Sequence, residues 1–416
     1  PESQRNMRDN TLGFIRELQK LSEDQLIKLT QFIVNRCFLI VVAVSSPDLD
    51  AVYRIFSVLN NRGLNLSYPD ILKAEIIKDV PSDQQEAYVT KWEEIEALLG
   101  RDAFEKLFIY LRAIFSRKRQ SKGMIEEFQE YVYPRRPRAA SPQDFVDNTL
   151  DRCAHALNYI MKANYSHKNL TKEKEEKING IFRLLNQLDY ERQYDYARWI
   201  PPALYYFFLN RSQPDLLLRF LTDLERLAVS FMLRRTPPYQ RFDRYYELLK
   251  AIHDGEDLYT PNSPLQLTPR ECTEVYRILN GNMYQMHYVC RYVLLRLDAK
   301  LSEGTASYNY QTISIEHVLP QRPSPDSKWV RAFPTREIRD KYINRLGNLV
   351  LLSQGKNMKA ENFDFDLKKR TYFTTNGGIS PFVLTTQVLQ QRDWTPAVIE
   401  QRQSQLMETL KQLWKL

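Results

Sequence analysis

The stretch SIEHVLPQ, from Ser314 to Gln321, places an acid and a histidine side by side in a short β-branched run. The chain has only five histidines in 416 residues, and Pro320 ends any regular element soon after this one. Successive side chains on a strand point to opposite faces, so Glu316 and His317 act together only if the chain twists there. The pair at this strand end is a candidate reactive site.

The sequence around the pair predicts two short strands and then a helix. The first strand lies within residues 309–320, and INRLGNLVLLS at 343–353 reads as the second. Residues 355–373 read as a short helix with its approach. An amphipathic C-terminal helix follows, with Thr395 as its N-cap. The expected fold is mainly α, with a helical bundle region followed by a small ββα module.

The length of the chain and the change in residue pattern along it predict three regions. A chain of 416 residues that is 43% apolar can bury more than one core. We expect a helical N-terminal part at 1–85, an almost wholly helical middle domain at 86–300 and the ββα module with the C-terminal helix at 301–416. The chain starts with Pro, so we expect it to be a fragment of a longer protein.

Charge and cysteine usage narrow the class of protein. The net charge of +8 is consistent with a polyanionic partner without requiring one. The four cysteines have no CxxC spacing, which argues against a zinc knuckle or a disulfide scaffold and favours a reducing cytoplasm. No apolar run reaches the roughly 20 residues that a membrane helix needs.

Four polar residues are expected to meet at one end of the hairpin: Glu316, His317, Asn348 and Asn357. Oxygen ligands from Glu316 and Asn357 suit one hard divalent cation such as Mg²⁺, with Mn²⁺ as an alternative. A neutral His317 beside it can take a proton from an attacking water. The metal would stabilise the charge that develops on a scissile phosphate.

This constellation resembles the HNH (ββα-metal, His-Me finger) nuclease motif and, more closely, the C-terminal domain of GmrSD-type and SspE-like restriction endonucleases. The residues that carry the resemblance are Glu316, His317, Pro320, Gln321, Trp329, Leu346, Gly347, Asn348, Leu349, Asn357, Asn362, Phe365, Lys368 and Tyr372. Upstream, residues 55–77 (IFSVLNNRGLNLSYPDILKAEII) resemble the end of the same family's N-terminal nucleotide-binding domain.

The resemblance implies a role for each residue. His317 would be the general base, Asn348 would orient its ring, and Glu316 and Asn357 would hold the metal. Lys368 would contact the phosphate backbone or the developing charge. The family's Asp-Gly-Gln-Gln-Arg motif is absent, so we expect no NTP binding by this chain and a missing nucleotide-binding domain in the intact protein. Glu also replaces the Asp common in other HNH enzymes.

DNA is the expected partner of the module. Lys356, Lys359, Lys369 and Arg370 lie on or beside the predicted helix, where cations would position phosphates without reading sequence. Basic loops at 117–122 and 135–138 offer a second path for the backbone.

The predicted function is metal-dependent cleavage of DNA, as a nick or a double-strand cut, in restriction of foreign or phage DNA. The alternative is a catalytically idle DNA-binding or regulatory scaffold of a defence system. Asn348 alone also fits a turn residue, and Asn357 alone fits a helix N-cap. Whether the protein forms a homo-oligomer is left open.

Overall fold

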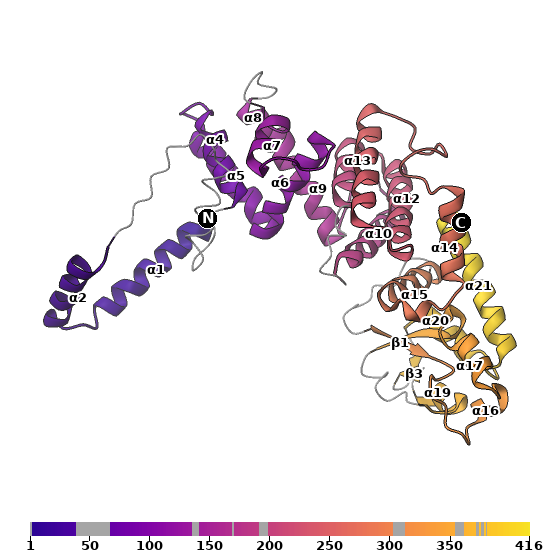
Figure 1. The fold of residues 1–416 in the computed structure, drawn as a ribbon. Coiled ribbons are helices and arrows are strands. Elements are labelled where there is room, and N and C mark those ends of the chain that lie inside the picture. The colour runs from indigo at the N-terminus through magenta and orange to yellow at the C-terminus, as the bar shows by residue number, and fades with distance from the viewer. Residues whose placement is uncertain are drawn as a thin grey trace. The chain divides into compact units, whose positions relative to one another are not determined.

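The computed structural model is mainly helical, as the sequence predicts (Figure 1). It describes residues 2–38, 67–134, 141–168, 170–190, 199–302, 313–353, 362–371, 374–375, 378–379 and 381–416. These residues form two compact units, one of 1–116 with 120–158 and one of 117–119 with 159–416. The domain boundaries at 85 and 300 stay predictions.

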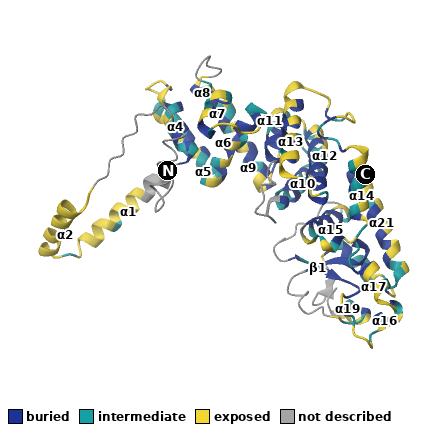
Figure 2. Ribbon diagram, viewed as in Figure 1, coloured by how far each residue is buried: buried dark blue, intermediate teal, exposed yellow. Residues whose placement is uncertain are grey.

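The first unit contains helices around an aromatic core. Its elements are α1 (Glu2–Leu18), α2 (Glu23–Arg36), α4 (Tyr68–Lys78), α5 (Gln85–Leu99), α6 (Arg101–Ser116), α7 (Met124–Tyr131), α8 (Pro142–Asp144), the π-helix η1 (Phe145–Leu150) and the start of α9 (Asp151–Lys162). Asp70 accepts hydrogen bonds from the backbone N–H and the hydroxyl of Ser67 at the start of α4. Helix α2 buries none of its residues (Figure 2).

The second unit begins with helices and ends with the mixed region. Its helices are α10 (Lys172–Tyr190), α11 (Ile200–Asn210), α12 (Pro214–Leu233), α13 (Pro238–Asp254), α14 (Pro269–Leu279), the 3₁₀ helix η3 (Met283–Gln285), α15 (His287–Leu301), α16 (Lys328–Ala332), α17 (Arg336–Ile343), the 3₁₀ helix η5 (Leu346–Asn348), α19 (Phe365–Thr371), α20 (Val383–Leu389) and α21 (Pro396–Trp414). The Thr395 side chain accepts from Val398 N–H at the start of α21, which confirms the predicted cap.

The two predicted strands form an antiparallel pair. Strand β1 (Ile313–His317) pairs with β2 (Leu349–Ser353), and His317 lies opposite Leu349. A second small pair joins β3 (Thr374–Thr375) to β4 (Gly378–Ile379). The order β1, β2, α19 follows the prediction, while assignment to a ββα nuclease module stays a prediction.

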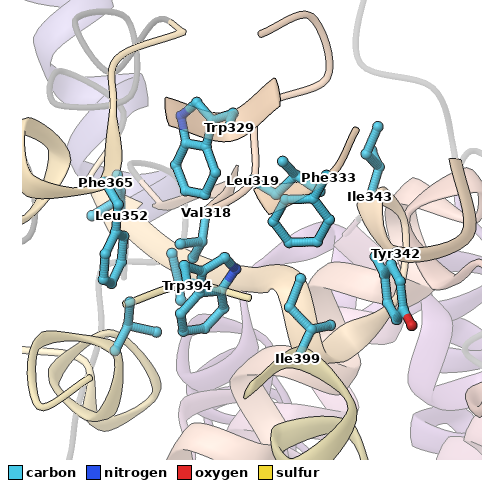
Figure 3. Packing of buried hydrophobic residues seen from close by; sticks show 12 residues of the cluster. Val318, Leu319, Trp329, Phe333, Tyr342, Ile343, Leu352, Phe365, Trp394 and Ile399 are labelled. Carbon is cyan, nitrogen blue, oxygen red and sulfur yellow. The ribbon is translucent and has the colours of Figure 1, made fainter. Parts of the chain in front are cut away.

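A hydrophobic cluster supports the strand pair from one side. It contains Val318, Leu319, Trp329, Phe333, Tyr342, Ile343, Val350, Leu352, Phe365, Val388, Trp394 and Ile399 (Figure 3). Val350 and Leu352 belong to β2, and Val318 and Leu319 directly follow β1. Burial of this apolar surface therefore packs β2 and the end of β1 with α19 and α21. The motif residue Trp329 lies in this cluster and donates from its indole to Phe363 O.

Several predicted features lie outside the described residues. They are residues 55–66 of the upstream signature, the basic loop 135–138, Lys356, Asn357, Lys359 and Tyr372. Among the helices that are described, none combines the length and the apolar character that crossing a membrane requires.

Candidate active site

A buried lysine pairs with the acid of the strand end. The Nζ atom of Lys368, on α19, donates to Oε1 of Glu316 at 2.7 Å and to the carbonyl oxygen of His317 at 2.7 Å. Lys368 is 1% exposed and Glu316 is 9% exposed. The ammonium therefore points into the protein, onto the end of β1, and is not displayed on the surface. A direct contact from Lys368 to DNA phosphates stays a prediction.

Burial moves both members of this pair toward their neutral forms. It raises the pKa of Glu316, and the Lys368 charge only partly opposes that rise. It lowers the pKa of Lys368 against the opposing effect of Glu316. Perturbed titratable pairs of this kind are more common at functional sites than elsewhere in proteins.

The His317 side chain is buried, and so is its Nε2 atom. Its Nε2 makes no hydrogen bond with any described residue. Burial lowers the pKa of His317 to about 4, with the charges of Lys368 and His287 acting in the same direction and the Asn344 amide opposing them. The imidazole is therefore neutral at pH 7 and can accept a proton at Nε2.

The Asn348 amide is bonded to groups around the strand end. Its Oδ1 accepts from Leu319 N–H at 2.8 Å and from the Trp394 indole at 3.0 Å. Its Nδ2 donates to the carbonyl oxygens of Leu319 and Ile343, both at 3.0 Å. Because a carboxamide has two donors and two main acceptor positions, these bonds occupy the whole group. Asn348 thus fixes the backbone that follows His317, and its role in orienting the imidazole stays a prediction.

Two further residues line the His317 side of the strand end, and sequence reasoning missed both. The ring of Tyr284, in η3, meets the imidazole edge to face at a centroid distance of 4.1 Å. Asn344, the C-cap of α17, has a buried Oδ1 that is unpaired among the described residues. Asn344 stands in the same INRLGN run as Asn348. Tyr284 lies outside the strand region and gave no comparable signal.

The 3₁₀ turn that carries Asn348 is held by α21. The Arg402 guanidinium donates to the carbonyl oxygens of Leu346, Gly347 and Leu349, and Gln403 accepts from Gly347 N–H at 2.7 Å. A Cβ atom on Gly347 would lie 2.5 Å from Ile399 O, so only glycine fits this approach. The Leu-Gly-Asn motif therefore reflects close packing against α21 as well as the polar site.

Two further predicted DNA contacts, Lys369 and Arg370, lie on α19. Lys369 is half-buried, donates to Gln391 O at 2.6 Å and lies over the Phe365 ring. Arg370 is exposed.

The donor set fits a metal ion that takes few protein ligands. No group of three or more His, Cys, Asp or Glu side chains suited to a metal occurs within the described ranges. The Glu316 carboxylate and the neutral, unpaired His317 imidazole are nevertheless ligand types that divalent ions accept. The Lys368 ammonium already bonds to two oxygens here, the Glu316 carboxylate and the carbonyl of His317. A cation on Glu316 would share that carboxylate with Lys368.

Comparison with known families addresses this same part of the chain. Residues 277–409 match the model of the GmrSD restriction endonuclease C-terminal domain. The matched range contains Glu316, His317, Asn348 and Lys368, and it confirms the resemblance that the motif predicted. The match associates this region with nucleases. Among curated proteins, none matches the chain.

Proposed function

We propose that this protein is a metal-dependent DNA endonuclease of the HNH type that acts in restriction of foreign or phage DNA. The observation that carries the proposal is the buried, neutral and unpaired Nε2 of His317 beside the Glu316–Lys368 pair, in a region similar to a restriction endonuclease domain. The order of β1, β2 and α19 supports the ββα assignment.

The chemistry follows from what each residue can do. His317 accepts a proton from the water that attacks the phosphate, because its lowered pKa keeps the imidazole neutral at neutral pH and leaves one ring nitrogen free to accept. Lys368 binds both Glu316 and the carbonyl of His317, so it fixes the two reactive residues relative to one another. Asn348 fixes the backbone just beyond them.

Glu316 and Asn357 are the residues that would hold one divalent ion, Mg²⁺ or Mn²⁺. When bound, this ion would supply positive charge for the phosphate and the leaving oxygen. The Lys368 ammonium offsets part of the Glu316 charge in the buried site, which limits how strongly this carboxylate alone attracts a second cation. A second ligand such as Asn357 is therefore part of the proposal.

The proposal also covers the setting of the reaction. We propose DNA as the partner, a cytoplasmic location, and regulation in the intact protein by a nucleotide-binding domain that this chain lacks. The chain itself should not turn over ATP or GTP, since its sequence carries no phosphate-cradling glycine loop.

A plasmid-cleavage assay with Mg²⁺ or with EDTA tests the function. We expect nicked or linear DNA with Mg²⁺ only, and a loss of about 10²–10⁴-fold in rate for His317→Ala, because a general base contributes that much. His253→Ala, the same change at an exposed histidine of α13, is the matched control. Cleavage by His317→Ala within tenfold of wild type would remove the general-base assignment. DNA binding without cleavage would favour the idle scaffold.

A further inference from the structure

We propose that Tyr284 is a positioning residue for His317, supplied by the helical part of the unit and not by the strand pair. This inference rests on the proposed role of His317 as a base. The positioning of the imidazole can be tested separately, because it concerns how the His317 ring is held and not which reaction the ring performs.

The contact between the two rings is direct. Their centroids are 4.1 Å apart and their planes are inclined by 68°, an edge-to-face arrangement. Such aromatic pairs contribute roughly 0.5–1.5 kcal/mol beyond the area they bury. Nε2 of His317 has no hydrogen-bond partner among the described residues. Ring packing against Tyr284 is therefore one restraint on the imidazole, beside the interaction with the Asn344 side chain that acts to raise its pKa.

Tyr284 is itself held in place by the backbone around the site. Its N–H donates to the carbonyl oxygen of Asn344 at 3.0 Å, just after α17. Four residues before it, Asn280 Oδ1 accepts from Arg345 and from Gln403, at 3.1 Å each. The segment that carries Tyr284 is therefore hydrogen-bonded both to the turn before Asn348 and to α21. These bonds hold the backbone from which the Tyr284 ring contacts the imidazole.

Tyr284 contacts a second imidazole as well. His287, at the start of α15, meets the same ring at a centroid distance of 4.5 Å and an inclination of 82°. His287 is exposed, whereas His317 is buried. The charged or titratable groups that act on His317 from other elements are Lys368 of α19 and His287 of α15, with Glu316 beside it on β1.

Two substitutions separate ring packing from the hydroxyl group. Tyr284→Phe keeps the edge-to-face contact, whereas Tyr284→Leu removes it while keeping apolar volume. Tyr276→Leu, at an exposed tyrosine of α14, is the matched control. We expect Tyr284→Leu to lower kcat for plasmid cleavage by about 10–100-fold, as small misplacements of a reacting group do. We expect KM to change by less than about threefold and Tyr284→Phe to restore kcat, because binding and ring packing are kept.

A spectroscopic readout tests the placement without using activity. In protein labelled at the histidine rings, the His317 signal is assigned by its loss in His317→Gln. The neighbouring aromatic ring should displace this signal, and the displacement should persist in Tyr284→Phe and Tyr276→Leu but vanish in folded Tyr284→Leu. An unchanged His317 signal in Tyr284→Leu, or an unchanged kcat, would overturn the proposal.

The two proposals fail in different ways. If His317→Ala cleaves DNA normally, the base assignment fails while the ring signal still reports whether Tyr284 holds the imidazole. If Tyr284→Phe is as impaired as Tyr284→Leu, the hydroxyl is what matters and packing is not the positioning device. A Tyr284→Leu variant that does not fold leaves Tyr284→Phe to decide, since a lost His317 displacement or kcat in that variant also contradicts the proposal.

Discussion

Two buried carboxylates each pair with a buried cation, but their surroundings differ. Glu127 in the first unit is 0% exposed and bonds to Arg112 at 3.1 Å, while Glu316 in the second unit bonds to Lys368 at 2.7 Å. Glu127 also accepts from the backbone N–H groups of Ser121 and Lys122. Glu316 accepts no comparable set of backbone bonds in the described structure.

The pKa values of the two acids move in opposite directions as a result. Burial acts to raise the pKa of Glu127, but the two N–H bonds and Arg112 outweigh it and lower the pKa. Burial of Glu316 is opposed mainly by Lys368, and its pKa is raised. A well-bonded buried acid anchors a loop. A buried acid with fewer donors remains available to bind a cation or a proton, which is the property a reactive site needs.

The strongest test of this comparison is the same change, Glu→Gln, at both positions. Glu127→Gln replaces one carboxylate oxygen by an NH₂ group, although the neighbours Arg112, Ser121 and Lys122 all donate hydrogen bonds to Glu127. The buried Arg112 guanidinium also loses its negatively charged partner. We expect a loss of about 3–5 kcal/mol in the free energy of unfolding. Glu316→Gln also removes the carboxylate partner of a buried cation, but it keeps an oxygen for Lys368 and disturbs fewer donors, so we expect a smaller loss of about 1–3 kcal/mol.

Urea unfolding at pH 7 gives the two stabilities, and plasmid cleavage by the folded variants gives their activities. The order should reverse for activity, because Glu316→Gln removes a proposed metal ligand and Glu127→Gln does not touch the site. Equal losses of stability at the two positions would show that the bonding difference has no energetic consequence.

The second test uses the pH dependence of stability. Since the pKa of His317 falls from 6.5 to about 4 on folding, the unfolded chain binds the proton first as pH decreases. The stabilisation from the neutral ring is fully present above pH 6.5 and is lost between pH 6.5 and 4. The full shift corresponds to about 3 kcal/mol. His317→Gln should lack this part of the acid destabilisation, as measured by unfolding at pH 7, 5.5 and 4. Parallel curves for both proteins would contradict the buried neutral imidazole.

A third test displaces the backbone turn that carries Asn348 and leaves the charged side chains of the site unchanged. Gly347→Ala puts a Cβ atom 2.5 Å from Ile399 O, so η5 must move away from α21. Overpacking of this kind costs about 1–3 kcal/mol. Gly180→Ala in α10 is the control, because its nearest neighbour is Arg183 at 3.9 Å and alanine favours a helix. Thermal unfolding should show a lower midpoint for Gly347→Ala only.

Sequence reasoning located the site through local signals. The strand pair and the cap at Thr395 follow from periodicity and capping chemistry. The contact of Glu316 with Lys368 requires two distant segments to fold onto each other. The family resemblance named both residues but implied a phosphate contact for Lys368.

Side-chain orientation was harder to predict than position. Sequence reasoning did not predict that the Asn348 amide bonds to the backbone of Leu319 and Ile343. It also did not predict that Lys368 is buried and bonded to Glu316, because the sequence alone does not show which side of a short helix packs against the strand end. Tyr284 approaches from a different helix, and no spacing within the ββα motif encodes such a contact.

The smallest expected effect concerns DNA binding along α19. The buried Lys368 ammonium is bonded within the site, and Lys369 donates to Gln391 O, so neither is a simple surface cation. Arg370 is exposed on the same helix and carries the expectation of a phosphate contact. Arg370→Ala should weaken binding to all DNA sequences alike and reduce the slope of log K against log salt concentration by about one unit. Lys369→Ala should change the slope less, because Lys369 is half-buried whereas Arg370 is exposed.

Lys250→Ala, at an exposed lysine of α13, is the control for a general loss of charge. Binding should be measured with EDTA, so that cleavage does not interfere, on two DNA duplexes of unrelated sequence. If Arg370→Ala and Lys250→Ala shift the slope equally, α19 has no special contact with DNA. The backbone path would then move to the basic loop at 117–122, where Arg119 is already paired with Asp243 and Arg117 becomes the residue to replace.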